Sequence, residues 1–254
     1  MKNFLLFISF IISSSNVFSQ NTSLPVKAYF GIQYKPLIAG DFIGSSRLSI
    51  KNDTIQGEFT QQLGASFGGV IRVQFKKNIA IETGINQVQR NYNIQFSRLD
   101  SAITATKSLK IIAFDIPVNL LFFVKLSNKI FMNTSLGPSF VFNPSNVQTN
   151  ALYNKYNLFR GEGRMRSVFS MEMNANLGFE YRTEKSGFFY IGASARVPFK
   201  PIFDVAVSHE NTITHQKMVL YGNMSGTYIS FDLRYFFPFN KYKTSNKLNM
   251  PIEQ

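Results

Sequence analysis

Carboxylates and arginines recur two residues apart in this 254-residue chain, and their spacing suggests ion pairs. Glu180 precedes Arg182, and Asp232 precedes Arg234. In an extended strand, residues two apart point to the same face, so each pair can meet on one face of a sheet. Two functions fit such pairs: an ion path or gate through a pore, or a structural plug of salt bridges. We favour the plug, which predicts negligible conductance, because a buried ion pair needs good geometry merely to offset its desolvation.

The two histidines, His209 and His215, lie in one segment near the C-terminus. The segment around His209 is similar to the His-x-Ser neighbourhood of outer-membrane lipid A deacylases, where a His–Ser pair with a carboxylate would activate a nucleophile. Here the second residue after His209 is Asn211, and no partner carboxylate can be assigned. A metal site would need ligands on one flexible loop to converge, which two His six apart seldom do. Its ligands would be His209, His215, Glu210 and Asp204. We therefore expect no catalytic residue, no metal and no cofactor, and keep an enzyme using the last loop as an alternative.

A basic and aromatic stretch falls within residues 143–166. It predicts either a surface that meets anionic lipopolysaccharide or a partner protein, or an ordinary solvated loop with aromatic side chains at the membrane rim. Gly161 and Gly163 do not form a phosphate-binding loop, because the strand–turn–helix context and the P-loop lysine are missing. The contact residues would be Lys155, Tyr156, Arg160, Arg164 and Arg166.

The composition excludes several classes of protein. Charged residues make up 16% of the chain, against about 25% in an ordinary soluble domain. The 27 Phe and 11 Tyr exclude a disordered polar chain. The absence of Cys excludes a disulfide scaffold, a thiolate metal site, a cysteine nucleophile and a lipidated bacterial N-terminus.

The first nineteen residues have the pattern of a cleavable secretory signal. Lys2 provides the positive charge, residues 4–12 the short apolar run, and Ser19 the small residue before the cleavage site. No later stretch approaches about eighteen consecutive apolar residues, so a helical membrane span is not expected. We divide the chain into a signal peptide at 1–19, a barrel at 20–239 and a basic periplasmic tail at 240–254. Because the mature chain is exported, its net positive charge would face lipid headgroups or envelope polymers, and nucleic acid is not an expected partner.

Period-two alternation predicts eight strands, joined by short turns on one side and long loops on the other. This is the pattern of an all-β, eight-stranded antiparallel up-and-down transmembrane β-barrel with short periplasmic turns and long extracellular loops. In one segment the apolar residues change from odd to even positions, which predicts either a β-bulge near 86–90 or an extension beyond the membrane. The strands are 27–39, 63–76, 78–96, 109–125, 129–142, 167–183, 187–199 and 223–239, and the loops are 40–62, 97–108, 143–166 and 200–222.

Alternation alone would also fit a soluble, lipocalin-like barrel with its apolar face inward, but the charges favour the opposite orientation. Five basic and five acidic residues share the polar face, which suits a narrow lumen filled by side chains. Turning the five basic residues to lipid would cost up to about 10–20 kcal/mol, at about 2–4 kcal/mol each. The aromatic side chains at the short-turn ends suit a membrane-interface girdle. The lumen network would contain Arg72, Glu82, Asp115, Lys125, Glu172, Glu180, Arg182, Arg196, Asp232 and Arg234.

Several segments resemble the small outer-membrane β-barrel proteins of Bacteroidota, the PorT-like group. The run Phe114–Leu120 looks like that group's acidic-Ile-Pro strand, and Leu136–Ser139 looks like the Gly-Pro step of its next strand. Phe30–Ile32 and Leu63–Phe67 resemble its Gly-punctuated opening strands. The resemblance spans about 27–239 and implies an eight-stranded barrel in the bacterial outer membrane. One type of member is associated with protein secretion, but no motif here places the chain in that subgroup.

The favoured function is a non-enzymatic outer-membrane barrel with a charge-plugged lumen, acting in envelope structure, surface interaction or a secretion or partner complex. Its expected partners are outer-membrane lipid and lipopolysaccharide, and a protein of the envelope. The alternatives are a lipid A deacylase-like enzyme using His209, a narrow pore, and a soluble exported binder.

Overall fold

The computed structural model describes residues 27–41, 46–101, 103–144, 146–154, 156–183 and 185–238, and these residues form thirteen strands. The predicted signal peptide and the tail at 240–254 lie outside the described residues. Within the described residues, no helix is long and apolar enough to cross a membrane. The strands are β1 (Lys27–Ala39), β2 (Arg47–Lys51), β3 (Ile55–Lys76), β4 (Ile79–Arg98), β5 (Ile103–Lys125), β6 (Ile130–Phe142), β7 (Val147–Asn154), β8 (Asn157–Met165), β9 (Phe169–Arg182), β10 (Phe188–Pro198), β11 (Phe203–Asn211), β12 (Lys217–Met224) and β13 (Tyr228–Phe236).

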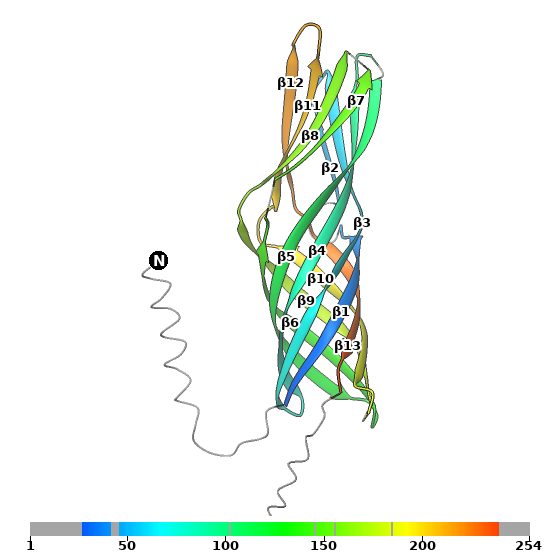
Figure 1. Cartoon of the computed structure of the whole chain (residues 1–254), viewed down its shortest axis with the longest axis vertical. Coiled ribbons are helices and arrows are strands. Elements are labelled where there is room, and N and C mark those ends of the chain that lie inside the picture. Colours follow the sequence, from blue (N-terminus) through cyan, green and yellow to red (C-terminus); the bar gives the residue numbers. More distant parts are fainter. Residues whose placement is uncertain are drawn as a thin grey trace, which may run out of the picture.

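Eight of these strands close into one antiparallel barrel (Figure 1). The order around the wall is β1-β13-β10-β9-β6-β5-β4-β3, and β1 pairs with β3 to complete the ring. Neighbours around the ring follow one another along the chain once β2, β7, β8, β11 and β12 are set aside. The exception is the pair formed by the first and last strands, β1 and β13. Closure gives every wall strand a partner on both sides, which lipid requires because it cannot satisfy a free backbone group. The predicted up-and-down barrel is confirmed.

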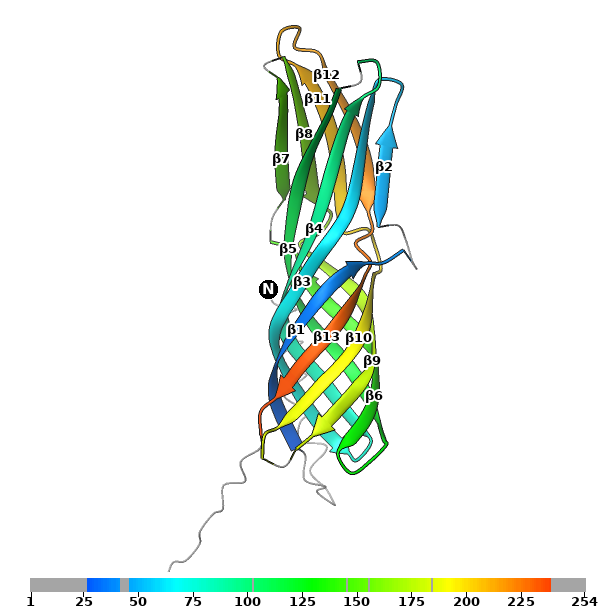
Figure 2. The ribbon, with the colours of Figure 1, turned by 90° about the vertical axis from the view of Figure 1, so that its right-hand side faces the viewer.

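A second β-structure, which we call the extension, stands on the barrel at the end away from the short turns (Figure 2). Strands β3, β4 and β5 are 22, 20 and 23 residues long and continue from the barrel into it. Strand β2 pairs with the upper part of β3, and β12-β11-β8-β7 form a separate four-stranded sheet. Much of the chain predicted as long loops is therefore strand, arranged as two sheets that face each other.

The two halves of the molecule have opposite polarity. In the barrel, Phe169 is 73% exposed and Leu177 55% exposed, whereas Glu180 is fully buried. This excludes the lipocalin-like alternative, in which the apolar face would be central. In the extension the apolar residues point inward and pack between the two sheets. Its core contains Phe59, Tyr92, Ile94, Phe96, Leu109, Ile111, Ala151, Phe159, Ile202, Phe203, Val205, Val207 and Met224.

This change of polarity explains the parity shift predicted in β4. Even-numbered residues face inward along the whole strand, from Ala80 through Arg90 to Phe96, and the β4–β5 ladder carries no register shift. The extra residue lies in the neighbouring strand β3, between Gln62 and Ala65. Of the two predicted explanations, the extension beyond the membrane is therefore the right one. A bulge at 86–90 is absent from this ladder.

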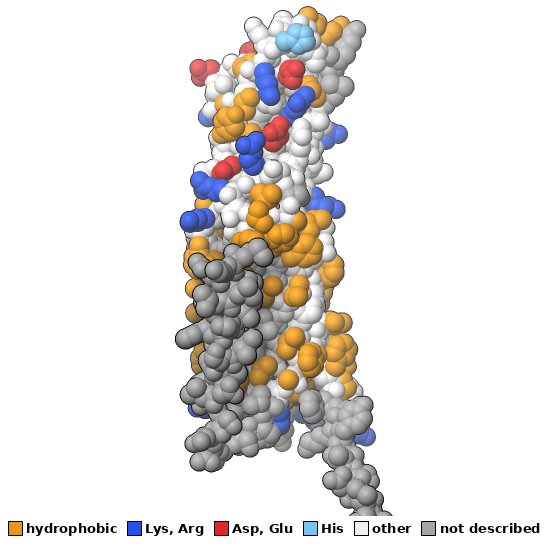
Figure 3. All heavy atoms as spheres, turned by 60° about the vertical axis from the view of Figure 1, so that its left-hand side comes forward, with side chains coloured by type: hydrophobic (Ala, Val, Ile, Leu, Met, Phe, Trp, Pro, Cys, Tyr) orange, Lys and Arg blue, Asp and Glu red, His pale blue; other side chains and the backbone are white. Residues whose placement is uncertain are grey.

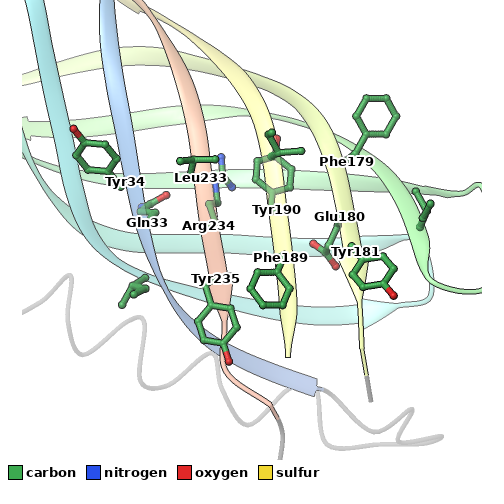
Figure 4. A pocket seen from close by; sticks show the side chains of 13 residues that line it. Gln33, Tyr34, Phe179, Glu180, Tyr181, Phe189, Tyr190, Leu233, Arg234 and Tyr235 are labelled. Atoms are coloured by element: carbon green, nitrogen blue, oxygen red, sulfur yellow. The ribbon is translucent and has the colours of Figure 1, made fainter. Parts of the chain in front are cut away.

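Aromatic side chains ring the outside of the barrel near its short-turn end, as predicted for an interfacial girdle. On neighbouring strands β10 and β13, the ring centroids of Phe189 and Tyr235 lie 5.0 Å apart, and Figure 4 shows the pair on the rim of a shallow apolar hollow. The predicted girdle residues are Phe75, Phe122, Phe179, Tyr181, Phe189, Tyr235 and Phe237, all partly or largely exposed.

Candidate functional site

The lumen of the barrel is filled with ion pairs, and the layer nearest the short turns centres on Arg72. Its guanidinium donates to Glu82 (Nη2–Oε2 2.9 Å) and also contacts Glu180 on the opposite wall. Arg234 contacts the second oxygen of Glu82. Arg182 donates from Nε to Glu180 Oε1 at 2.5 Å. Three arginines thus share two carboxylates, and one network joins β3, β4, β9 and β13.

The next layer is organised around Asp232, a fully buried carboxylate on β13. Lys35 Nζ lies 3.2 Å from Asp232 Oδ2, and Arg234 Nη2 lies 2.7 Å from the same oxygen. The hydroxyl of Ser194 and the amide of Asn176 also donate to it, at 2.6 and 3.1 Å. With four donors on one oxygen and the Ser230 hydroxyl on the other, the charge of Asp232 is satisfied without solvent.

The layer below the extension contains two further pairs. Arg196 Nη1 lies 2.5 Å from Asp115 Oδ2, and Arg90 Nη2 lies 2.6 Å from Glu172 Oε1. Arg196 also lies 3.6 Å from the other oxygen of Glu172, which links the two pairs. Ser139 bridges Arg196 and Asp115 through its hydroxyl. Each of these four charged residues is at most 2% exposed.

Apolar layers close both ends of this charged column. Towards the extension, Leu37, Val88 and Tyr228 form a buried cluster, and the Arg90 guanidinium lies 5.0 Å from the centroid of the Tyr228 ring. Towards the short turns, the Arg182 guanidinium lies 4.2 Å from the centroid of Phe131. The rings of Phe123 and Phe188 also lie against Arg182, at 5.0 and 5.2 Å.

Eight of the ten predicted lumen residues are buried in this column, and Arg182 is a ninth, partly exposed member. The placement of Lys125 was wrong: its side chain is exposed beside a short turn, where the ammonium group keeps its hydration. Two cations that the structure buries were absent from the predicted network. Lys35 lies on β1, where the alternation in the sequence is weak. Arg90 lies in the segment 86–90, where the sequence analysis allowed a β-bulge. The lumen thus contains five buried cations and five buried anions, but the cations are not the predicted five. They are Lys35, Arg72, Arg90, Arg196 and Arg234.

The sequence predicted a flexible loop around His209, but the structure places this residue in a strand. It is 1% exposed on β11, its ring centroid lies 4.9 Å from that of Phe159, and its Nε2 lies 2.8 Å from Asn157 Oδ1. Burial lowers the pKa of the imidazole, and the positive charge of Arg98 lowers it further. His215 is exposed in the turn after β11, with a φ of 54°. Across the described residues, no three His, Cys, Asp or Glu side chains are grouped to hold a metal ion.

The predicted basic surface lies on β8 and its hairpin. Arg160 pairs with Glu210 at 3.7 Å, and Arg166 Nε lies 3.4 Å from Asp204 Oδ1. Arg164 is exposed on the same outer face of the extension. Tyr156 is 40% exposed at the hairpin tip, and Lys155 lies outside the described residues.

A closed antiparallel barrel with an apolar exterior and a charged interior defines an outer-membrane β-barrel protein. The chain belongs to the family described as "Outer membrane protein beta-barrel domain", which it matches over residues 18–242. No curated protein sequence matches it.

Several solved structures are similar to the chain, to different degrees. The outer membrane protein OprG from Pseudomonas aeruginosa is similar with a TM-score of 0.52 and 13% identity, over 84% of this chain and 96% of OprG. The protease OmpT from Escherichia coli gives a TM-score of 0.34 at 10% identity, over 86% of this chain and 99% of OmpT. The transport unit of the autotransporter AIDA-I from Escherichia coli gives 0.26 at 10% identity, over 91% of this chain and 97% of that unit. The likeness to OprG shows the fold alone.

Proposed function

We propose that this protein is a closed, non-conducting outer-membrane barrel that holds a rigid β-structure outside the cell for surface interaction. The observation that carries the proposal is the double closure of the lumen. Interlocked ion pairs fill the barrel, and the apolar core of the extension lies above them. An ion would have to break buried charge pairs and then cross an apolar core, and each step is costly without water.

Planar-bilayer recordings test the closed lumen. The mature protein is expected to give no conductance steps, and charge reversal at Arg182 or Arg234 is expected to reduce folding without creating a selective current. Steady conductance in the unmodified protein, with a selectivity that changes on those reversals, would support the narrow pore instead. The matched control is reversal of Lys125, which is exposed outside the lumen.

The same proposal makes the protein non-enzymatic. The support is the position of His209: its imidazole is packed against Phe159, and its Nε2 is engaged by an amide oxygen of Asn157. A general base needs an accessible nitrogen within hydrogen-bond reach of the nucleophile. Outer-membrane preparations with the wild-type chain and with His209→Ala are expected to deacylate lipid A equally little. A deacylation that depends on His209 would overturn this part of the proposal.

The exposed outer face of the extension supports a partner of negative charge, such as lipopolysaccharide or an acidic protein of the envelope. Arg164, Arg166 and Lys217 line a surface hollow of about 490 Å³ there, with Tyr221 beside them. Glu162 and Asp204 also line it, so the three cations exceed the carboxylates by one.

We further propose that the chain belongs to the PorT-like subgroup. In its support, the two motif-bearing segments pair side by side, with Pro117 opposite Ser139. A detergent pull-down from the native membrane that recovers a secretion component would support membership of the secretion type, and recovery of lipopolysaccharide alone would contradict it.

A further inference from the structure

A groove of about 970 Å³ lies on the outside of the molecule where the barrel meets the extension. It forms because β9 and the end of β10 separate there. The ladder between them ends at a bond from the Phe199 amide to the Met171 carbonyl (3.1 Å), and the chains meet again where the Arg166 amide contacts the Ile202 carbonyl (3.4 Å). Pro201 falls between these bonds and has no N–H to donate, so the strand pairing cannot continue through the gap.

The lower wall of the groove is apolar and faces the membrane. It consists of the side chains of Phe140, Phe169, Met171 and Phe199, which are 48%, 73%, 44% and 59% exposed. These residues lie at the end of the lipid-facing surface that adjoins the extension. In an outer-membrane barrel with short periplasmic turns, that end meets the outer leaflet. The wall is therefore placed to contact acyl chains.

The upper wall of the groove is basic. Arg166 and Lys200 line it, and Figure 3 shows lysine and arginine side chains directly above the hydrophobic band. Asp204 lies 3.4 Å from Arg166 Nε and offsets one of the two charges. Lys200 is exposed and has no ion-pair partner among the residues that the structure describes. Ser167 also lines the groove, but its hydroxyl donates to the Phe169 carbonyl at 2.6 Å.

We propose that this groove binds an anionic lipid of the outer leaflet, a phosphorylated glycolipid with several acyl chains. Its phosphate would lie between Arg166 and Lys200, and its acyl chains would cover the four apolar side chains below. A soluble anion would leave the apolar wall uncovered, and an uncharged lipid would leave the positive charge of Lys200 unmatched. The inference adds a lipid site beside the basic hollow of the proposed function, with which it shares Arg166, and it does not depend on the closed lumen.

Native mass spectrometry of the full mature chain tests the site. The protein is reconstituted in phosphatidylcholine nanodiscs with graded amounts of bisphosphorylated lipid A, and retained lipid A is counted after release. We expect the variant Arg166→Gln/Lys200→Gln to bind lipid A roughly thirtyfold more weakly, at about 1 kcal/mol for each basic side chain near an anionic surface. The matched control, Lys76→Gln/Lys77→Gln, removes the same charge at a short turn and is expected to bind like the wild type.

Two further arms identify the ligand. Dephosphorylated lipid A is expected to bind the wild type as weakly as lipid A binds the double variant, and millimolar inorganic phosphate is expected not to displace lipid A. Equal lipid A binding by the double variant and the wild type would overturn the site. Displacement by inorganic phosphate would overturn the lipid assignment. Heat-modifiable migration in gel electrophoresis confirms that each variant is folded, and unchanged silence in bilayers keeps this test separate from the closed-barrel proposal.

Discussion

Arg196 on β10 reaches across the lumen to Asp115 on β5, with 2.5 Å between Nη1 and Oδ2. Strands β5 and β10 are not neighbours, because β6 and β9 lie between them in the wall. The contact therefore connects two distant parts of the barrel through its interior. Since both side chains are buried, neither charge can be satisfied by water when its partner is removed.

Removal of the Asp115 carboxylate should therefore destabilise the folded barrel. We expect Asp115→Ala to lower the free energy of unfolding by about 3–5 kcal/mol, because it leaves a buried guanidinium without its main counter-ion. Urea unfolding in phospholipid vesicles, followed by circular dichroism, measures the change. The exposed Lys125→Ala is the control and should change stability by less than about 0.5 kcal/mol. The charge-swapped pair Asp115→Arg/Arg196→Asp should recover part of the loss. Equal stability of the Asp115 and Lys125 variants would contradict the role of this pair.

The within-strand ion pairs could be predicted from sequence, but the cross-lumen pairs could not. Residues two apart share a face in any strand, and Glu180–Arg182 and Asp232–Arg234 indeed lie 2.5 and 2.7 Å apart. The partners across the lumen depend on how the sheet closes and on the stagger between strands, which one sequence does not encode locally. Lys35 was missed for a different reason: its strand alternates weakly.

The sequence pattern allowed one strand to extend beyond the membrane, but most residues of the other strands of the extension were assigned to loops. These strands are β2, β7, β8, β11 and β12. A signal was present in 203–211, where Phe203, Val205 and Val207 alternate with more polar residues and all three are buried. The parity change in β4 was a second signal. The sequence does not show that a second sheet packs against these strands. Without that sheet, the sequence pattern of a short strand with a polar outer face resembles that of a loop.

A contact between the two sheets of the extension gives the next prediction. Gly57 on β3 faces Val207 on β11, and a Cβ added at Gly57 would overlap the valine methyl groups. We expect Gly57→Ala to destabilise the extension by about 1–3 kcal/mol through overpacking. In the double variant Gly57→Ala/Val207→Ala the smaller side chain makes room, so the loss should be less than the sum of the two single losses. Hydrogen exchange of β3 and β11 amides measures this, and strictly additive losses would show that the residues do not share packing space.

The buried His209 predicts a pH dependence of the extension. Burial, and then the charge of Arg98, lower its pKa in the folded state below the unfolded value of about 6.5. The unfolded state therefore binds more protons, so stability is complete above about pH 6.5 and is lost as the pH falls through the folded-state pKa. Amide exchange itself slows as the pH falls, so the quantity to compare is the protection factor, the ratio of the intrinsic to the observed exchange rate. Protection factors in β8 and β11 should be lower at pH 5.5 than at pH 7.5.

Two histidine variants separate this effect from general acid lability. His209→Gln stays neutral and can still hydrogen-bond to Asn157, so its protection factors should not show the additional decrease at pH 5.5. His215→Asn is the control, because the exposed residue 215 has a positive φ that Asn tolerates. This control should keep the full pH dependence. If both variants behave alike, the titrating group is not His209.

The extra residue in β3 gives a prediction about assembly. Gln62 and Leu63 both face outward at the register shift, so the bulge reverses which positions of β3 face the lumen. Deletion of Gly64 would remove the extra residue and restore a regular ladder. If β3 keeps its inward-facing positions in the extension, its barrel part would then turn Arg72 to lipid. This would cost about 2–4 kcal/mol, in addition to the loss of the buried ion pairs of Arg72. We expect the deletion to abolish the heat-modifiable folded form in outer-membrane fractions. Deletion of Ser101, in the turn between β4 and β5, shortens the chain equally and should assemble like the wild type. Equal assembly of the two deletions would show that the bulge does not set the register of the barrel.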